Sequence, residues 1–362
     1  MKIIRSYVMK EYFPPFLFGI LIFTFIFLAS KMINITDMVI NKGVGLTPVM
    51  QLIGYSLPPI LILTIPMGVL LANLLGFSRL SQDNEITALK ANGVNILSII
   101  LAPLFTGILI SIALFIFYNQ ALPAFHYGFF ETSFKISQEK PSLELREHAF
   151  NNLANTRIYI NKIEPKTFAL IDVIISENDE QTSKFIQAEK GTTYLCENGS
   201  KLILKLENGA IHQTDPIDKN KYQSLLFNTH NVVINLNSQA TLKREKMLEE
   251  MSGKELKNEI SKYKTAKIAV NPFLVELYRR ESLPFACIAF TLFAIPLGLR
   301  SKNKSKSISF GLSVLIIFAY YMLLIISETL SLRGTFSVAL TMWMPNIIIG
   351  GIGAFLLFRE LK

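Results

Sequence analysis

Six stretches of the chain are long and apolar enough to cross a lipid bilayer as helices. A helical span needs about 20 mainly apolar residues, and 51% of the 362 residues are hydrophobic. We expect membrane helices at about 14–35, 50–78, 97–118, 283–300, 308–330 and 338–357. This spacing places three spans on each side of a long polar section, so the chain is predicted to be a multi-pass membrane protein with an inserted domain.

The distribution of basic residues predicts the orientation of these spans, because cytoplasmic loops are enriched in lysine and arginine. Basic residues flank the N-terminus, a polar insert, the loop 300–306 and the C-terminus: Lys2, Arg5, Lys10, Arg79, Lys90, Arg300, Lys302, Lys304, Lys306, Arg359 and Lys362. All four groups fall on one side if both termini are cytoplasmic. We attribute the net charge of +9 to this anchoring and expect no nucleic-acid partner.

The middle section would then lie outside, and its pattern predicts β-structure between helical stalks. Short alternating runs occur at 157–160, 168–175, 192–195, 201–205 and 231–236. Asn-Gly turns are expected at 197–200 and 207–209. Ser252 and Glu255 form a capping-box pattern for a charged helix. We therefore predict domains at 1–120 (spans one to three), 121–280 (an all-β, jelly-roll-like domain with stalks) and 281–362 (spans four to six).

The polar insert Arg79–Gly93, between the second and third spans, predicts a short amphipathic helix at about 81–93. Ser81, Asp83 and Asn84 offer N-cap side chains, and Gly93 suits a left-handed C-terminal residue. Helical spacing places Glu85, Ile86 and Leu89 on roughly one face. The insert either docks to another protein or lies on the membrane surface, and the pattern alone does not decide between these two roles.

Catalytic chemistry has little support in the sequence. There is no GxxxxGK[ST] loop and no GxGxxG after a strand, and the four histidines lack metal-ligand spacing. We expect the chain not to be an enzyme and to hold no cofactor or metal, so any ATP would be used by a partner.

Three basic residues lie at the outer ends of expected spans: Lys31, Arg279 and Arg280. Ionisable side chains there either extend to the interface as anchors or bind an acidic lipid headgroup. Both readings stay open at this point.

Short motifs in order along the chain resemble the lipopolysaccharide-export permeases of the LptF/LptG type. In the insert, Ser81, Glu85, Leu89, Ala91 and Gly93 fit the family pattern. Further matching motifs are Pro58-Pro59, Ile65-Pro66-Met67, Asn119 with Pro123, Glu276–Arg280 before Pro284, Pro296-Leu-Gly298 and Trp343-Met-Pro-Asn346. The resemblance covers nearly the whole chain, although the strand-rich middle matches only in character.

The resemblance implies a permease subunit of an ABC transporter that extracts lipopolysaccharide from the outer leaflet of the bacterial inner membrane. Its implied partners are an LptB-type ATPase dimer that binds ATP and magnesium, a second LptF/LptG-type permease, and LptC/LptA-type periplasmic bridge proteins. Residues implied in ATPase coupling are Ser81, Asp83, Glu85, Thr87, Leu89, Ala91 and Gly93. Lys31, Arg279 and Arg280 are the expected headgroup contacts.

Two other functions remain open from the sequence. One is an exporter subunit of similar design that handles another lipid or a lipoprotein. The other is a non-transporting membrane anchor or sensor whose outer β-domain binds a ligand.

Overall fold

The chain forms two compact units in a computed structural model. The helical unit comprises residues 1–33, 53–129 and 246–362, and the sheet unit comprises residues 34–52 and 130–245. The structure describes residues 2–40, 44–139, 148, 150–153, 156–164, 169–178, 183–195, 201–214, 222–235, 246–265, 270–300, 306–334 and 336–361.

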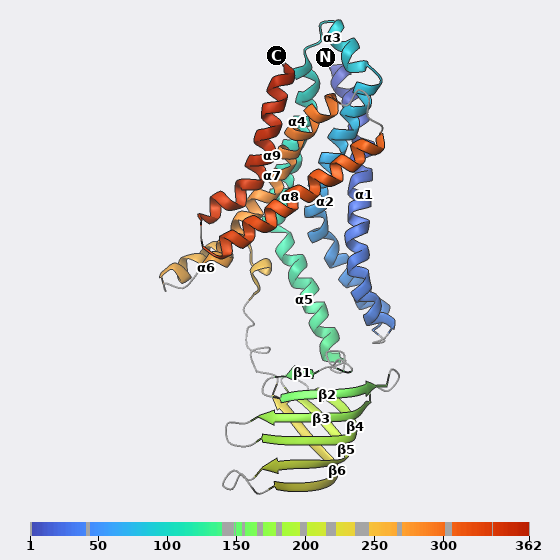
Figure 1. Ribbon diagram of the computed structural model, residues 1–362, viewed down its shortest axis with the longest axis vertical. Helices are drawn as coiled ribbons and strands as arrows, with labels where there is room; N and C mark the ends of the chain where they lie inside the picture. Colours follow the sequence, from blue (N-terminus) through green and yellow to red (C-terminus); the bar gives the residue numbers. More distant parts are fainter. Residues whose placement is uncertain are drawn as a thin grey trace. The chain divides into compact units, whose positions relative to one another are not determined.

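Six helices of the described chain are long and apolar enough to span a membrane, which confirms the six predicted spans (Figure 1). They are α1 (Lys2–Ile40), α2 (Leu46–Gln82), α4 (Ile96–Gln120), α7 (Asn271–Leu299), α8 (Lys306–Leu332) and α9 (Val338–Leu361). The shorter helices are α3 (Glu85–Ala91), α5 (Leu122–Glu139), η3 (Leu248–Glu250) and α6 (Gly253–Thr265). Each long helix extends beyond its apolar stretch, because the flanking polar residues are also compatible with a helix.

Helix α2 is the centre of the helical unit. Of its most apolar window, 78% is buried inside the protein, compared with 11% for α1. Where α1 crosses α2, a Cβ at Gly68 would lie only 2.9 Å from Ile20, so glycine permits the close approach. Side-chain hydrogen bonds join α2 to three neighbours: Thr64 to Thr24 of α1 (3.0 Å), Asn73 to Thr291 of α7 (3.3 Å) and Ser78 to Ser309 of α8 (3.0 Å).

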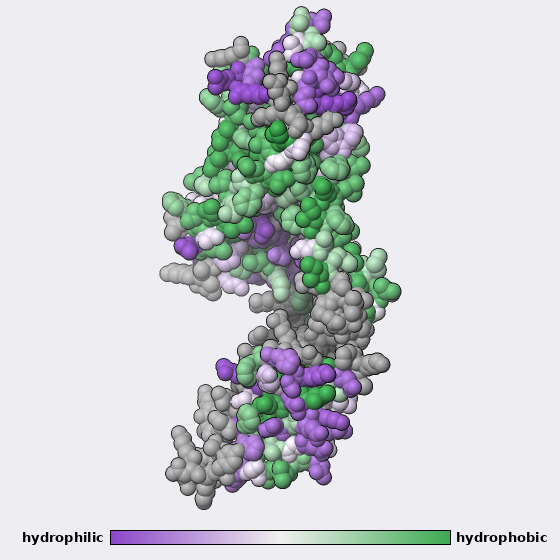
Figure 2. Space-filling view, turned by 45° about the vertical axis from the view of Figure 1, so that its right-hand side comes forward, coloured by the Kyte–Doolittle hydropathy of each residue, from purple (hydrophilic) through white to green (hydrophobic). Residues whose placement is uncertain are grey.

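The helical unit has an apolar outer band. On the face drawn in Figure 2, this hydrophobic band lies between hydrophilic residues at the end that carries α3 and further hydrophilic residues toward the other end. Large apolar side chains of α1, α4 and α8 remain exposed, for example Phe25 at 69%, Phe105 at 63% and Phe318 at 66%. An exposed apolar band of this kind suits contact with lipid tails.

The sheet unit contains one antiparallel sheet of six strands in the sequential order β1-β2-β3-β4-β5-β6. The strands are β1 (Phe150–Leu153), β2 (Thr156–Ile163), β3 (Leu170–Asn178), β4 (Ser183–Leu195), β5 (Lys201–Thr214) and β6 (Tyr222–Asn235). Ile158, Ile175, Ile186 and Ile211 lie opposite one another on four neighbouring strands, and all are buried. The predicted inserted β-structure is confirmed. The strand order left open by the sequence is that of a meander, so the described strands form one sequential sheet where a jelly-roll-like arrangement was expected.

A row of polar residues crosses the sheet and shifts its inside–outside alternation. Asp172 and Asn208 both have left-handed backbones, with φ of 52° and 53°. In β3 the buried positions change from Val173 to Leu170 across Asp172, and in β5 they change from Leu206 to Ile211 across Asn208. The turn predicted at 207–209 is therefore wrong. Strand β5 pairs with β4 and β6 in the same register on both sides of Asn208. Asparagine tolerates a positive φ, so Asn208 adopts this backbone conformation within the strand and not in a turn.

The turn predicted at 197–200 lies outside the described residues. The capping box is confirmed at the start of α6: the Ser252 hydroxyl accepts from the Glu255 amide (3.3 Å), and Glu255 accepts from the Ser252 amide (2.8 Å). Helix α6, η3 and the first part of α5 belong to the helical unit.

Candidate functional site

Helix α3 is a short helix that follows α2 and ends in a defined C-terminal motif. Its C-terminus has the hydrogen bonds of a Schellman motif, from Gly93 N to Lys90 O and from Val94 N to Leu89 O, with Gly93 at a φ of +75°. This confirms the expected left-handed glycine. The N-terminus differs from the prediction, because Asn84 occupies the cap position with a left-handed backbone and makes no side-chain cap hydrogen bond.

The apolar side of α3 packs against its own chain. Ile86 is buried, and the half-buried Leu89 packs in the same cluster, with Phe77, Leu80 and Leu299. The exposed side of α3 consists of Thr87, Ala88, Lys90 and Ala91, beside exposed Asp83 and Gly93. Because Leu89 packs inward, the surface that α3 offers to a partner is small, with Thr87 and Lys90 as its polar side chains.

Ser81 takes no part in that surface. Only 2% of it is exposed, and its hydroxyl donates to the Leu299 carbonyl oxygen at 2.7 Å. This bond joins the end of α2 to the end of α7. Ser81 therefore fixes the position from which α3 begins.

Glu85 is bound by a residue that the sequence did not single out. The Tyr7 hydroxyl donates to Glu85 Oε1 at 2.9 Å, and Arg79 forms an ion pair with Glu11. Arg79 Nε also lies 3.6 Å from Asp83 Oδ2. Two polar contacts thus connect α1 to the segment that carries α3. The sequence could have indicated Glu11, since a carboxylate beside a membrane span requires a partner. No sequence pattern pointed to Tyr7.

These contacts all lie at one end of the helical unit. Figure 1 shows α3 beside both chain termini. Arg300, after α7, forms an ion pair with Glu360 near the end of α9. Arg79, Arg300 and Arg359, described members of the basic groups used to predict orientation, therefore lie at the end that carries α3.

Lys31 of α1 is an exposed basic side chain. Its Nζ lies 5.6 Å from the centroid of the Phe129 ring, and no described carboxylate pairs with it. A cation on an aromatic face keeps its donors available for an anion.

The two neighbouring arginines of α7 have different environments. Arg279 is half-buried, and its Nε lies 3.3 Å from Glu328 Oε1 of α8. Arg280 is 1% exposed and donates to Glu276 Oε1 (2.7 Å) and to the carbonyl oxygens of Met251 (2.6 Å) and Leu248 (2.8 Å).

Arg280 therefore holds η3 against α7. Its guanidinium also lies over the Tyr118 ring, 5.7 Å from the centroid. These partners use three of the five N–H donors of Arg280, and its burial keeps the guanidinium away from the surface, so the role expected for Arg280 does not fit this conformation. Lys31 is the basic residue of the three that remains open to a ligand.

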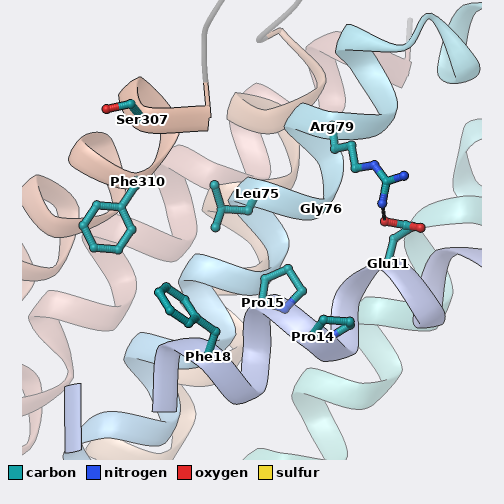
Figure 3. A pocket seen from close by; sticks show the side chains of 9 residues that line it. All are labelled: Glu11, Pro14, Pro15, Phe18, Leu75, Gly76, Arg79, Ser307 and Phe310. Atoms are coloured by element: carbon teal, nitrogen blue, oxygen red, sulfur yellow. Dashed lines mark hydrogen bonds and ion pairs between the residues drawn. The ribbon is translucent and has the colours of Figure 1, made fainter. Parts of the chain in front are cut away.

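A pocket of about 570 Å³ lies between α1, α2 and α8 (Figure 3). It is lined by Glu11, Pro14, Pro15, Phe18, Leu75, Gly76, Arg79, Ser307 and Phe310. Its walls are mainly apolar, and the Glu11–Arg79 ion pair lies at its edge. Within the described residues, no group of three or more His, Cys, Asp or Glu side chains could hold a metal ion.

A protein-family model, the lipopolysaccharide export system permease LptF/LptG, matches residues 6–359. No curated protein matches the chain at a significant level. The match includes all six apolar helices and the inserted antiparallel sheet. The chain therefore belongs to the LptF/LptG permease family, as a multi-pass membrane protein with an inserted β-domain.

Proposed function

We propose that this permease subunit extracts lipopolysaccharide from the outer leaflet of the inner membrane and passes it to a periplasmic bridge. The observation that carries the proposal is the connection of α3 to α1 through Tyr7 and Glu85. It joins a helix with a polar exposed surface to the helix that carries Lys31.

ATP binding and hydrolysis are assigned to a separate LptB-type ATPase dimer that also binds magnesium. It would contact the exposed side of α3, at Asp83, Thr87, Ala91 and Gly93. Ser81 and Leu89 would support this surface from inside the protein. Both termini and α3 would lie in the cytoplasm, since basic residues concentrate at that end.

Helix α1 would carry the movement across the membrane. Tyr7 and Lys31 are 24 residues apart on one helix, a rise of about 36 Å at about 1.5 Å per residue. This exceeds the hydrocarbon thickness of about 30 Å. A displacement of α3 at one surface would therefore reach Lys31 at the other.

Extraction of the substrate needs both an anion contact and external work. Exposing acyl chains to water costs about 0.8 kcal/mol per CH₂, which a partner ATPase can supply. Lys31 would bind a phosphate of the lipid headgroup. A second LptF/LptG-type permease would form a lipid-binding cavity together with this subunit. The buried apolar face of the sheet unit would receive the lipid and pass it to the LptC/LptA-type bridge.

Co-purification with the ATPase tests this assignment. Thr87→Arg and Glu85→Arg should remove the ATPase from the purified complex, whereas Thr265→Arg, which adds the same charge as Thr87→Arg at an exposed position of α6, should retain it. Full retention by both α3 variants would contradict the docking role. Lipid analysis of the native complex should find lipopolysaccharide, and another lipid or a lipoprotein in its place would contradict the substrate.

A further inference from the structure

The pocket between α1, α2 and α8 lies away from the proposed headgroup contact at Lys31. All its lining residues belong to the helical unit, and all fall within the three candidate spans. Its position beside Arg79 and Glu11 places it toward the end that carries α3. A membrane-spanning protein therefore has an apolar pocket on the side of the bilayer opposite Lys31.

The shape and lining of the pocket suit a hydrocarbon chain. Pro14, Pro15 and Phe18 of α1 form one wall, and Phe310 of α8 stands across from Phe18 (Figure 3). Its volume lies within the range of about 300–1,000 Å³ typical of sites for small ligands. Gly76 and Leu75 of α2 also line the pocket.

The edge of the pocket carries a basic group. The Arg79 side chain is 48% exposed, whereas its partner Glu11 is 19% exposed. Arg79 is therefore the cationic side chain at the edge of the pocket, and it pairs with two carboxylates, Glu11 and Asp83.

Selectivity at such a site must come from the headgroup. An acyl chain gains little by leaving other lipid tails, since those tails are equally apolar. An arginine next to an anionic leaflet attracts a phosphate and can bind it in a bidentate way. Arg79 thus favours an anionic lipid over a zwitterionic one.

We propose that this pocket binds an anionic glycerophospholipid of the cytoplasmic leaflet, with one acyl chain between α1 and α8 and its phosphate on Arg79. The lipid phosphate competes with Glu11 for the guanidinium. Because Arg79 also pairs with Asp83, next to α3, the bound lipid alters the link between α1 and the docking surface. The site does not depend on which substrate is exported.

Native mass spectrometry of the complete complex tests the proposal. The complex is released from nanodiscs of phosphatidylethanolamine with a minority of phosphatidylglycerol, and the retained lipids are identified. The wild-type complex should retain phosphatidylglycerol in excess of its share of the bilayer. Arg79→Gln should lower this excess about fivefold, the factor expected for one basic residue near an anionic surface.

Two matched pairs of variants separate this pocket from general lipid contact. Arg300→Gln removes another arginine that pairs with a carboxylate at the same end of the helical unit, and it should leave the excess unchanged. Ser307→Trp fills the mouth and should remove the excess, whereas Ile308→Trp, at the next exposed position, should not.

Three outcomes of these lipid measurements would overturn the proposal: no excess in the wild type, an equal loss in Arg300→Gln, or an unchanged excess in Ser307→Trp. A crosslink between position 18 and a helix of the second permease would also overturn the proposal, because that helix would then occupy the pocket in place of a lipid. Lipopolysaccharide included in a parallel nanodisc should not replace phosphatidylglycerol at this site. Failure here would leave the extraction role assigned to Lys31 untouched.

Discussion

The hydroxyl of Tyr7 donates a 2.9 Å hydrogen bond to Glu85, which is 78 positions later in the chain. This contact joins the first turns of α1 to the first residue of α3. Glu85, the carboxylate that fits the family pattern, therefore holds α3 against the membrane helix α1, in addition to any contact with an ATPase. Changes at Glu85 and at Tyr7 should consequently differ in their effects.

Lys31 should contact the substrate headgroup. Lys31→Glu should reduce crosslinking of lipopolysaccharide to this region about tenfold or more, since a hydrogen bond to a charged group contributes about 1.5–3 kcal/mol. Export should fall with it. Lys10→Glu, on the same helix near its other end, is the control. Unchanged crosslinking and export in Lys31→Glu would remove Lys31 from the site.

Arg280 should matter for stability. Arg280→Met leaves Glu276 buried and unpaired, which typically costs about 3–5 kcal/mol. Thermal unfolding of the complex in detergent measures the loss. The double variant Arg280→Met with Glu276→Leu should recover part of it, because no lone charge remains. An unchanged unfolding temperature in Arg280→Met, with reduced lipopolysaccharide binding, would instead support a headgroup role.

Protonation of His126 should destabilise the helical unit. Burial lowers its pKa by more than the nearby Glu249 carboxylate, 3.5 Å away, raises it. The folded protein therefore favours neutral histidine. Its stabilising contribution is present above a pH of about 6.5 and is lost as the pH falls through the folded-state value.

The unfolding temperature should accordingly decrease between about pH 7 and about pH 5, and His126→Gln should reduce this dependence. A histidine signal that titrates above its ordinary value in nuclear magnetic resonance would show that Glu249 dominates, contrary to this expectation.

Asn208 should require a residue that tolerates positive φ. Asn208→Gly should be nearly neutral, whereas Asn208→Val should destabilise the sheet by about 1–2 kcal/mol. Hydrogen exchange of the β5 amides in the full chain measures this directly. As a control, Thr193→Val lies in regular β4, where β-branched residues are favoured. Equal protection in Asn208→Val and the wild type would contradict the conformational argument.

The sequence predicted those elements that depend on local chemistry. Span length follows from the apolar runs, and the α6 capping box and the Gly93 terminus follow from the residue types at fixed spacing. The long strands β4, β5 and β6 were only partly predicted. Lysine, glutamate and glutamine interrupt their alternation, and pairing with neighbouring strands sustains them nonetheless.

The site depended on contacts that the sequence does not encode locally. Arg279 and Arg280 are adjacent, yet about 100° of helix rotation turns one toward Glu328 and the other toward η3. Periodicity likewise placed Ile86 and Leu89 on one side of α3 but could not show that this side faces inward. Only tertiary packing distinguishes a supporting face from a docking face.

Transmission from α3 to α1 is tested most directly by the amount of lipopolysaccharide released per ATP hydrolysed in the reconstituted complex. Tyr7→Phe removes one hydroxyl and should lower this ratio about fivefold, since one hydrogen bond contributes about 1 kcal/mol. Binding of the ATPase should be unchanged, and Tyr127→Phe, on exposed α5, should match the wild type. A wild-type ratio in Tyr7→Phe would contradict transmission through the Tyr7–Glu85 contact.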